Sequence, residues 1–131
     1  MQQPLISVIV PAYNLEDCLG RALDSILKQG IKNMEVIVVD DMSSDGTWEL
    51  IKKYEKNDNR IISIRMNHRS KPSGARNAAL EVAKGKYIHF CDGDDAVPAK
   101  SYKVMLEVAE KQNVDIVTGN YMRMYPNERK E

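Results

Sequence analysis

Short hydrophobic runs alternate along this chain with segments whose apolar residues recur every three or four positions. The runs are rich in β-branched residues, which is typical of strands buried on both faces, and the spacing of three and four predicts amphipathic helices. The predicted strands are 5–10, 34–39, 60–66, 87–91 and 114–119. The predicted helices are 14–27, 48–56, 73–83 and 98–109. Pro11 is expected to end the first strand, Asn14 to cap the first helix and Ser73 to cap the third.

Strands that alternate with helices indicate one fold class. The order predicts an α/β domain with a doubly wound, mostly parallel sheet and helices on both faces. With 131 residues the chain suits a single domain, 1–131. Its last part, 120–131, is polar and unpatterned, so we expect a frayed tail or a truncation point there.

Composition narrows the possible partners. Lys plus Arg and Asp plus Glu both number 19, so the formal net charge is zero, and this balance argues against nucleic acid as a partner. No apolar run approaches the ~20 residues of a transmembrane segment. Cys18 and Cys91 form no CxxC pair and are expected to be free thiols. We expect a cytoplasmic protein or, at full length, one at the cytoplasmic face of a membrane.

The strongest chemical signal is a group of carboxylates at the end of one predicted strand. Asp92, Asp94 and Asp95 follow an apolar run and are interrupted only by Gly93. Carboxylates this close repel one another unless some are protonated or a cation lies between them. In an extended chain Asp92 and Asp94 would face one ligand, and Gly93 would let it approach the backbone. The alternative is an acidic turn that caps the next helix.

Four loop segments are expected to meet at one edge of the sheet, because ligands of doubly wound sheets bind beyond the carboxyl ends of the strands. The segments are 11–14, 40–41, 73–76 and 92–95. Together they offer carboxylates for Mg²⁺ or Mn²⁺, an arginine for an anion and a tyrosine for a flat surface. Asp94 is the predicted metal ligand. Arg76 has the alternative of pairing with Asp41 or Asp92, and Tyr13 that of packing on the first helix.

These segments also resemble, in their order and spacing, the motifs of family 2 glycosyltransferases. The matching stretches are 8–14, 35–47, 74–79 and 92–95. The resemblance covers 5–119 and implies the GT-A fold, in its nucleotide-sugar-binding part. It also implies a nucleotide-diphosphate sugar as donor, for which we expect a UDP-sugar, and transfer with inversion at the anomeric carbon.

The resemblance assigns a role to each matching residue. Pro11, Ala12 and Tyr13 correspond to the family's turn against the nucleoside, and Asp41 to the carboxylate that accepts the N–H of the base. Arg76 corresponds to the arginine beside the base and phosphates. In the DxD motif, Asp92 corresponds to the ribose-side member, Gly93 to the middle residue and Asp94 to the metal-binding member.

The sequence departs from the family in one respect. The family's catalytic base lies in a later acidic segment, and no such segment precedes Glu131, so we assign no catalytic residue. The chain is expected to bind donor without transferring it, as a domain that lacks the C-terminal acceptor part, and the acceptor stays open between a glycan, a lipid carrier and a protein. The alternatives are a non-catalytic nucleotide-sugar-binding module and a phosphoacceptor signalling domain.

Overall fold

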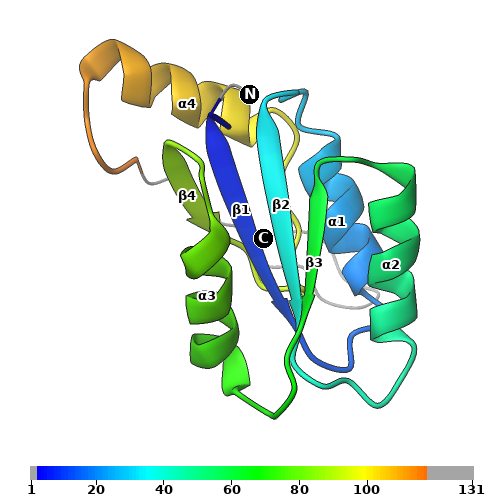
Figure 1. Cartoon of the computed structure of the whole chain (residues 1–131). Helices are drawn as coiled ribbons and strands as arrows, with labels where there is room; N and C mark the ends of the chain where they lie inside the picture. The colour runs from blue at the N-terminus through cyan, green and yellow to red at the C-terminus, as the bar shows by residue number, and fades with distance from the viewer. Residues whose placement is uncertain (1–2, 118–131) are drawn as a thin grey trace.

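The computed structural model describes residues 3–117, which form alternating strands and helices. In chain order these are β1 Ile6–Ala12, α1 Leu19–Leu27, β2 Met34–Asp40, α2 Thr47–Asn57, β3 Ile61–Arg65, α3 Lys71–Val82, β4 Tyr87–Phe90 and α4 Ser101–Gln112 (Figure 1). Within this part of the chain, no helix has both the length and the apolar character needed to cross a membrane.

The strands form one sheet in the order β3-β2-β1-β4, and all three neighbouring pairs are parallel. The predicted doubly wound α/β fold is therefore confirmed. The order reverses between β1 and β4, which is where such sheets bind ligands. A phosphoacceptor signalling domain would have its second strand at the outer edge of the sheet, next to the first. Here β3 occupies that edge and β2 lies between β3 and β1, so that alternative does not fit the topology.

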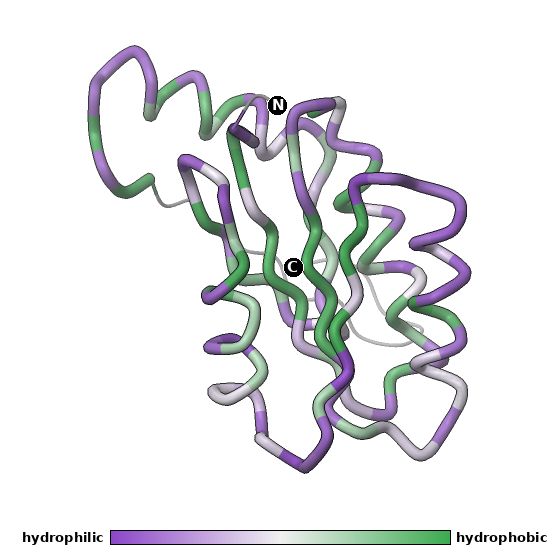
Figure 2. The backbone as a smooth tube through the Cα atoms, viewed as in Figure 1, coloured by the Kyte–Doolittle hydropathy of each residue, from purple (hydrophilic) through white to green (hydrophobic). Residues whose placement is uncertain are grey.

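Helices cover both faces of the sheet and create two hydrophobic cores. Val8 and Val10 of β1 belong to the larger core, with α1, α2 and α4. Ile9 belongs to the smaller core and packs with Ala75 and Ala79 of α3. All five side chains are fully buried, and burial of each valine or isoleucine contributes about 1.5–3 kcal/mol. Figure 2 shows the hydrophobic colour concentrated along the strands.

The first strand continues through Pro11, where we had expected it to end. Pro11 pairs with Val39 of β2, and its carbonyl accepts the N–H of Gly93. The β1–β4 ladder ends at Phe90, so the missing N–H of Pro11 falls beyond the last paired residue of β4. A proline is tolerated in this central strand because no ladder hydrogen bond is lost.

The first helix begins at Leu19, five residues later than the predicted cap at Asn14. Asn14 has a left-handed backbone (φ 51°), which is not a capping conformation. Its own N–H bonds to the Ser43 hydroxyl, and the N–H of Leu15 bonds to Thr47 Oγ1. Contacts with the loop after β2 therefore replace the local cap, and sequence periodicity contains no sign of them.

The later helices and strands also begin or end at residues other than those predicted. α3 begins at Lys71, so Ser73 lies inside the helix and does not cap it; Pro72 occupies the first turn, where its missing N–H costs little. The predicted strand 114–119 is wrong over 114–117, and 118–119 lie outside the described residues. The chain leaves α4 through Asn113 in a left-handed conformation, so it turns back at the helix end.

His89 of β4 lies in the interface with α4. Its Nδ1 is 2.8 Å from the Tyr102 hydroxyl, and the two rings meet edge to face. His89 is thus a partly buried, hydrogen-bonded histidine of this interface. Burial lowers its pKa below the ordinary 6.5, so the neutral form is favoured in the folded protein.

We predict that His89→Gln reduces the loss of stability on acidification. The unfolded chain takes up a proton at His89 at a higher pH than the folded protein does, so this residue weakens folding as the pH falls below 6.5. Each unit of pKa difference is worth about 1.4 kcal/mol. Urea unfolding at about pH 7.5 and about pH 5.5 measures the effect. The matched control is His68→Gln, which makes the same replacement at an exposed position. An equal loss in wild type and His89→Gln would contradict the prediction.

Candidate nucleotide-sugar site

A cavity of about 250 Å³ opens at the carboxyl edge of the sheet. It is lined by Pro11, Ala12, Tyr13, Leu15, Asp41, Arg69, Pro72, Ala75, Asp92, Gly93 and Asp94. Seven of the eight residues predicted to bind nucleotide sugar are among them. The eighth, Arg76, is absent from the lining but contacts one of its members. The loops after β1, β2 and β4 and the start of α3 therefore converge, as the parallel topology predicts (Figure 1).

The loops after β1 and β2 are joined by reciprocal hydrogen bonds. Besides the two bonds that displace the cap of α1, the Asn14 side-chain oxygen accepts the N–H of Ser44 at 2.8 Å. Glu16 donates its N–H to Asp45 at 3.3 Å and accepts that of Gly46 at 3.2 Å. Each loop supplies both donors and acceptors to the other. The two segments that carry Tyr13 and Asp41 therefore form one connected wall of the cavity.

Asp41 is buried at the foot of this wall and fully engaged. One carboxylate oxygen accepts the N–H and the hydroxyl of Ser70 at 2.7 and 2.8 Å. The other accepts Arg69 Nη1 at 3.0 Å. The Arg69 guanidinium lies 3.5 Å from the centre of the Tyr13 ring, which is 43% exposed. Tyr13 therefore presents a partly exposed ring to the cavity, with Arg69 stacked on it.

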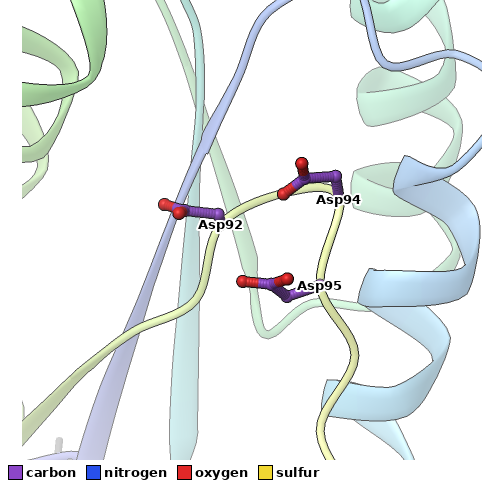
Figure 3. Close-up of side chains that lie close together, drawn as sticks. All are labelled: Asp92, Asp94 and Asp95. Atoms are coloured by element: carbon purple, nitrogen blue, oxygen red, sulfur yellow. The ribbon is translucent and has the colours of Figure 1, made fainter. Parts of the chain in front are cut away.

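The carboxylates after β4 surround a turn (Figure 3). The N–H of Asp95 bonds to the carbonyl of Asp92 at 2.9 Å, so the chain is not extended here as we had expected. The turn brings in a third acid: carboxylate oxygens of Asp92, Asp94 and Asp95 all lie within 4.8 Å of one another. Among residues 3–117, the Asp92 carboxylate bonds Arg76, whereas no hydrogen bond or ion pair engages that of Asp94.

Arg76 pairs with Asp92 rather than with Asp41. Its Nη2 donates to Asp92 at 2.7 Å, and both side chains are partly exposed, at 35% and 49%. Of the two internal partners considered for Arg76, the structure selects Asp92. An exposed pair of this kind is worth about 1 kcal/mol at most, so little free energy opposes its opening toward an anion.

Glycine at position 93 allows close packing of the acidic turn against other parts of the protein. A Cβ there would lie 2.8 Å from Leu15 Cδ1 and 3.1 Å from both Leu19 Cδ1 and the Pro11 carbonyl. These atoms belong to the protein, so the missing side chain lets the acidic turn pack against β1 and α1. Close packing of the backbone is thus one reason for glycine here, and Gly93 also lines the cavity.

The electrostatics of the turn reflect its crowded negative charge. Burial raises the pKa of Asp95, and the charges of Asp94 and Asp92 raise it further. Burial and the same three acids raise the pKa of the Cys91 thiol to about 12. Cys91 is therefore an unreactive core residue, and a cation among the acids would relieve the repulsion.

Four residues of this site were missed or left unassigned from the sequence. Arg69 and Ser70 bind Asp41, Asp95 joins the acidic turn, and Arg21 of α1 donates to the Asp94 carbonyl at 3.2 Å. The stretch 67–72 is polar and basic in the sequence. Its partner could not be inferred, because the pairing depends on how the loop after β3 folds over the end of β2.

Comparison with known proteins gives consistent results. A family model described as glycosyl transferase family 2 matches residues 7–131. The chain is 40% identical over 117 residues to UDP-Glc:alpha-D-GlcNAc-diphosphoundecaprenol beta-1,3-glucosyltransferase WfaP of Escherichia coli. That alignment covers 89% of this chain and 46% of WfaP.

Solved structures extend the similarity to the fold. The chain resembles S. aureus TarS in complex with UDP-GlcNAc, with a TM-score of 0.77 and 33% identity over 82% of this chain and 32% of TarS. It also resembles the mannosyltransferase PcManGT from Pyrobaculum calidifontis in complex with GDP-Man and Mn²⁺, with a TM-score of 0.70 and 29% identity over 79% and 31% of the two chains. The GT-A type of sheet is thereby confirmed. The chain spans less than half the length of these relatives.

We predict that Arg69→Met costs more stability than the matched change Arg76→Met. Removal of Arg69 leaves the buried Asp41 carboxylate with Ser70 alone, which should cost about 1–3 kcal/mol. Removal of Arg76 breaks only an exposed pair and should cost about 1 kcal/mol at most. Urea unfolding with a common m-value measures both. Equal costs would show that the Arg69–Asp41 contact is not the stronger anchor.

Proposed function

The chain belongs to glycosyl transferase family 2, and from this premise we propose that its cavity binds a nucleotide-diphosphate sugar with Mg²⁺ or Mn²⁺. One observation carries the proposal. Tyr13 and Asp41, which suit a base, line the same cavity as Asp94, which suits a metal ion. A nucleotide-diphosphate sugar with its metal needs both kinds of contact at different points of one molecule. We take a UDP-sugar as the donor and sugar transfer as the activity of the whole protein.

The contacts that Arg69 makes support the binding of the nucleotide base at Tyr13 and Asp41. A flat guanidinium stacks on Tyr13 and donates to the Asp41 carboxylate. A pyrimidine can make the same two contacts, stacking its ring and donating an N–H. We propose that uracil takes this place and that the Arg69 side chain, which is 44% exposed, turns toward solvent or the phosphates. Pro11 and Ala12 then contribute the adjoining wall.

The acidic turn fits a hard divalent cation. It offers only carboxylate oxygens, which Mg²⁺ and Mn²⁺ prefer, and three of them lie within 4.8 Å of one another. We assign Asp94 as the metal ligand, because it lines the cavity and, within residues 3–117, its carboxylate has no other partner. Asp95 can assist, and Asp92 with Arg76 lies on the ribose and phosphate side. Bound there, the ion would offset the charge of the diphosphate.

Acceptor binding is proposed for the part of the relatives that this chain does not span. The chain covers 46% of WfaP and 32% of the TarS chain, so residues 3–117 are assigned to the donor. The catalytic base and the inversion at the anomeric carbon would then depend on polypeptide beyond the donor half. The name of WfaP includes a diphosphoundecaprenol-linked sugar, which favours a lipid-linked acceptor and a location at the cytoplasmic face of a membrane.

We predict that UDP stabilises the chain more with Mn²⁺ than without it and that Asp94→Asn removes this difference. The variant keeps the shape of the side chain but loses the charge that attracts the ion. A ligand at 100 times its Kd adds about 2.7 kcal/mol of stability, which a thermal-unfolding series with UDP, Mn²⁺ and both together can resolve.

The matched control is Asp115→Asn. Asp115 is an exposed acid that lines a separate cavity, with Tyr87 and Lys86 at the start of β4. This variant should keep the full Mn²⁺ dependence. Stabilisation of wild type by UDP that is the same with and without Mn²⁺ would contradict the metal assignment, and the absence of stabilisation by UDP would contradict the donor assignment.

A further inference from the structure

The segment 91–100, which carries the acidic turn, contains no helix or strand. Its backbone N–H and C=O groups must still find partners where they are buried. Several of those partners are side chains that recur every four residues on and after α1: Arg21, Ser25 and Gln29. A spacing of four residues places them along one face of the helix. We call these three residues the α1 polar row.

The α1 polar row bonds the segment at successive points. Arg21 Nη2 donates to the Asp94 carbonyl at 3.2 Å, and the Ser25 hydroxyl accepts the N–H of Val97 at 2.9 Å. Gln29 Nε2 donates to the carbonyls of Val97 and Pro98 at 3.3 and 2.9 Å. Gln29 Oε1 accepts the N–H of Tyr102 at 3.1 Å. The row thus holds the chain from the acidic turn to the start of α4.

Burial makes the contacts of Gln29 with this segment specific, whereas the Arg21 contact is exposed. Gln29 is 4% exposed and Val97 9% exposed, so neither can exchange its partner freely for water. The Asp94 side chain has no anchor of its own among residues 3–117. Its carboxylate is therefore directed by the backbone of the turn, which the α1 polar row holds together with the bond from the Gly93 N–H to the Pro11 carbonyl.

We propose that Arg21, Ser25 and Gln29 are positioning residues for the metal ion. They contact the backbone of the acidic turn and of the segment after it rather than the ion, and they hold Asp94 in the geometry that the ion requires. A ligand set must be fixed to within about 0.5 Å to bind well, and a turn without regular structure cannot supply that precision alone. This inference rests on the proposed function, because it presupposes that the turn binds a divalent cation.

Ser25→Ala tests the inference without changing any charge. It removes the acceptor of the Val97 N–H and, at a helical position, favours the helix. Ser25→Thr keeps the hydroxyl and is the rescue variant. Ser63→Ala is the matched control, because the Ser63 hydroxyl bonds Glu55 of α2 and no part of 91–100.

Two measurements follow, both on the whole 131-residue chain. Amide hydrogen exchange without metal reports the Val97 N–H, and the amides of β1 verify that each variant is folded. Calorimetry then gives the Kd of UDP with and without Mn²⁺. For Ser25→Ala we expect faster exchange at Val97 and an affinity for UDP in the presence of Mn²⁺ that is about fivefold weaker, with the metal-free affinity unchanged. Ser25→Thr and Ser63→Ala should bind as wild type does.

Two results would overturn the inference, and they are distinguishable. If wild type shows Mn²⁺-dependent binding and Ser25→Ala retains it within about twofold while Val97 exchanges faster, the row is structural only. If wild type shows no dependence on Mn²⁺, the metal assignment fails and the positioning role fails with it.

Discussion

Electrostatic repulsion within one turn is the constraint around which this structure is arranged. Asp92, Asp94 and Asp95 hold carboxylate oxygens within 4.8 Å of one another at the end of β4. Only one of the three is offset by an ion pair, that of Asp92 with Arg76, within the residues that the structure describes. A chain free to move would separate these charges. Backbone packing at Gly93 and hydrogen bonds from α1 keep them together. The resulting repulsion costs free energy, which a cation bound among the carboxylates would offset.

The walls of the cavity follow from the parallel sheet. Because every strand runs in the same direction, the loops after β1, β2 and β4 all emerge at one edge. The reciprocal bonds between the first two loops connect Tyr13 with Asp41, and α1 connects the first loop with the acidic turn. The base end and the metal end of the cavity are therefore parts of one hydrogen-bonded framework, although they are far apart in the sequence.

The sequence predicted those features that depend on periodicity and on topology. Buried strands, amphipathic helices and a shared edge follow from the spacing of apolar residues and from the alternation of elements, and the acidic residues at strand ends then fall into one cavity. It did not predict features decided by tertiary contacts. Asn14 loses its capping role to Ser43 and Ser44, and Arg69 reaches Asp41 only because the loop after β3 folds back.

Gly93 and Asp95 show the same limit at the site itself. An Asp-Gly-Asp-Asp sequence after a strand is compatible with both an extended chain and a turn, and that choice decides which carboxylates meet. In the structure the chain is turned, and Gly93 packs closely against Leu15 and Leu19, which lie more than 70 positions away in the sequence. Local chemistry identified the acids, whereas long-range packing selects the geometry.

The most direct test of the proposed donor site is a crystal structure of the chain with UDP and Mn²⁺, with anomalous scattering used to locate the metal. We expect a single manganese peak bonded to the Asp94 carboxylate and to the diphosphate, with uracil over Tyr13 and hydrogen-bonded to Asp41. A manganese peak away from Asp94, or UDP bound outside this cavity, would contradict it.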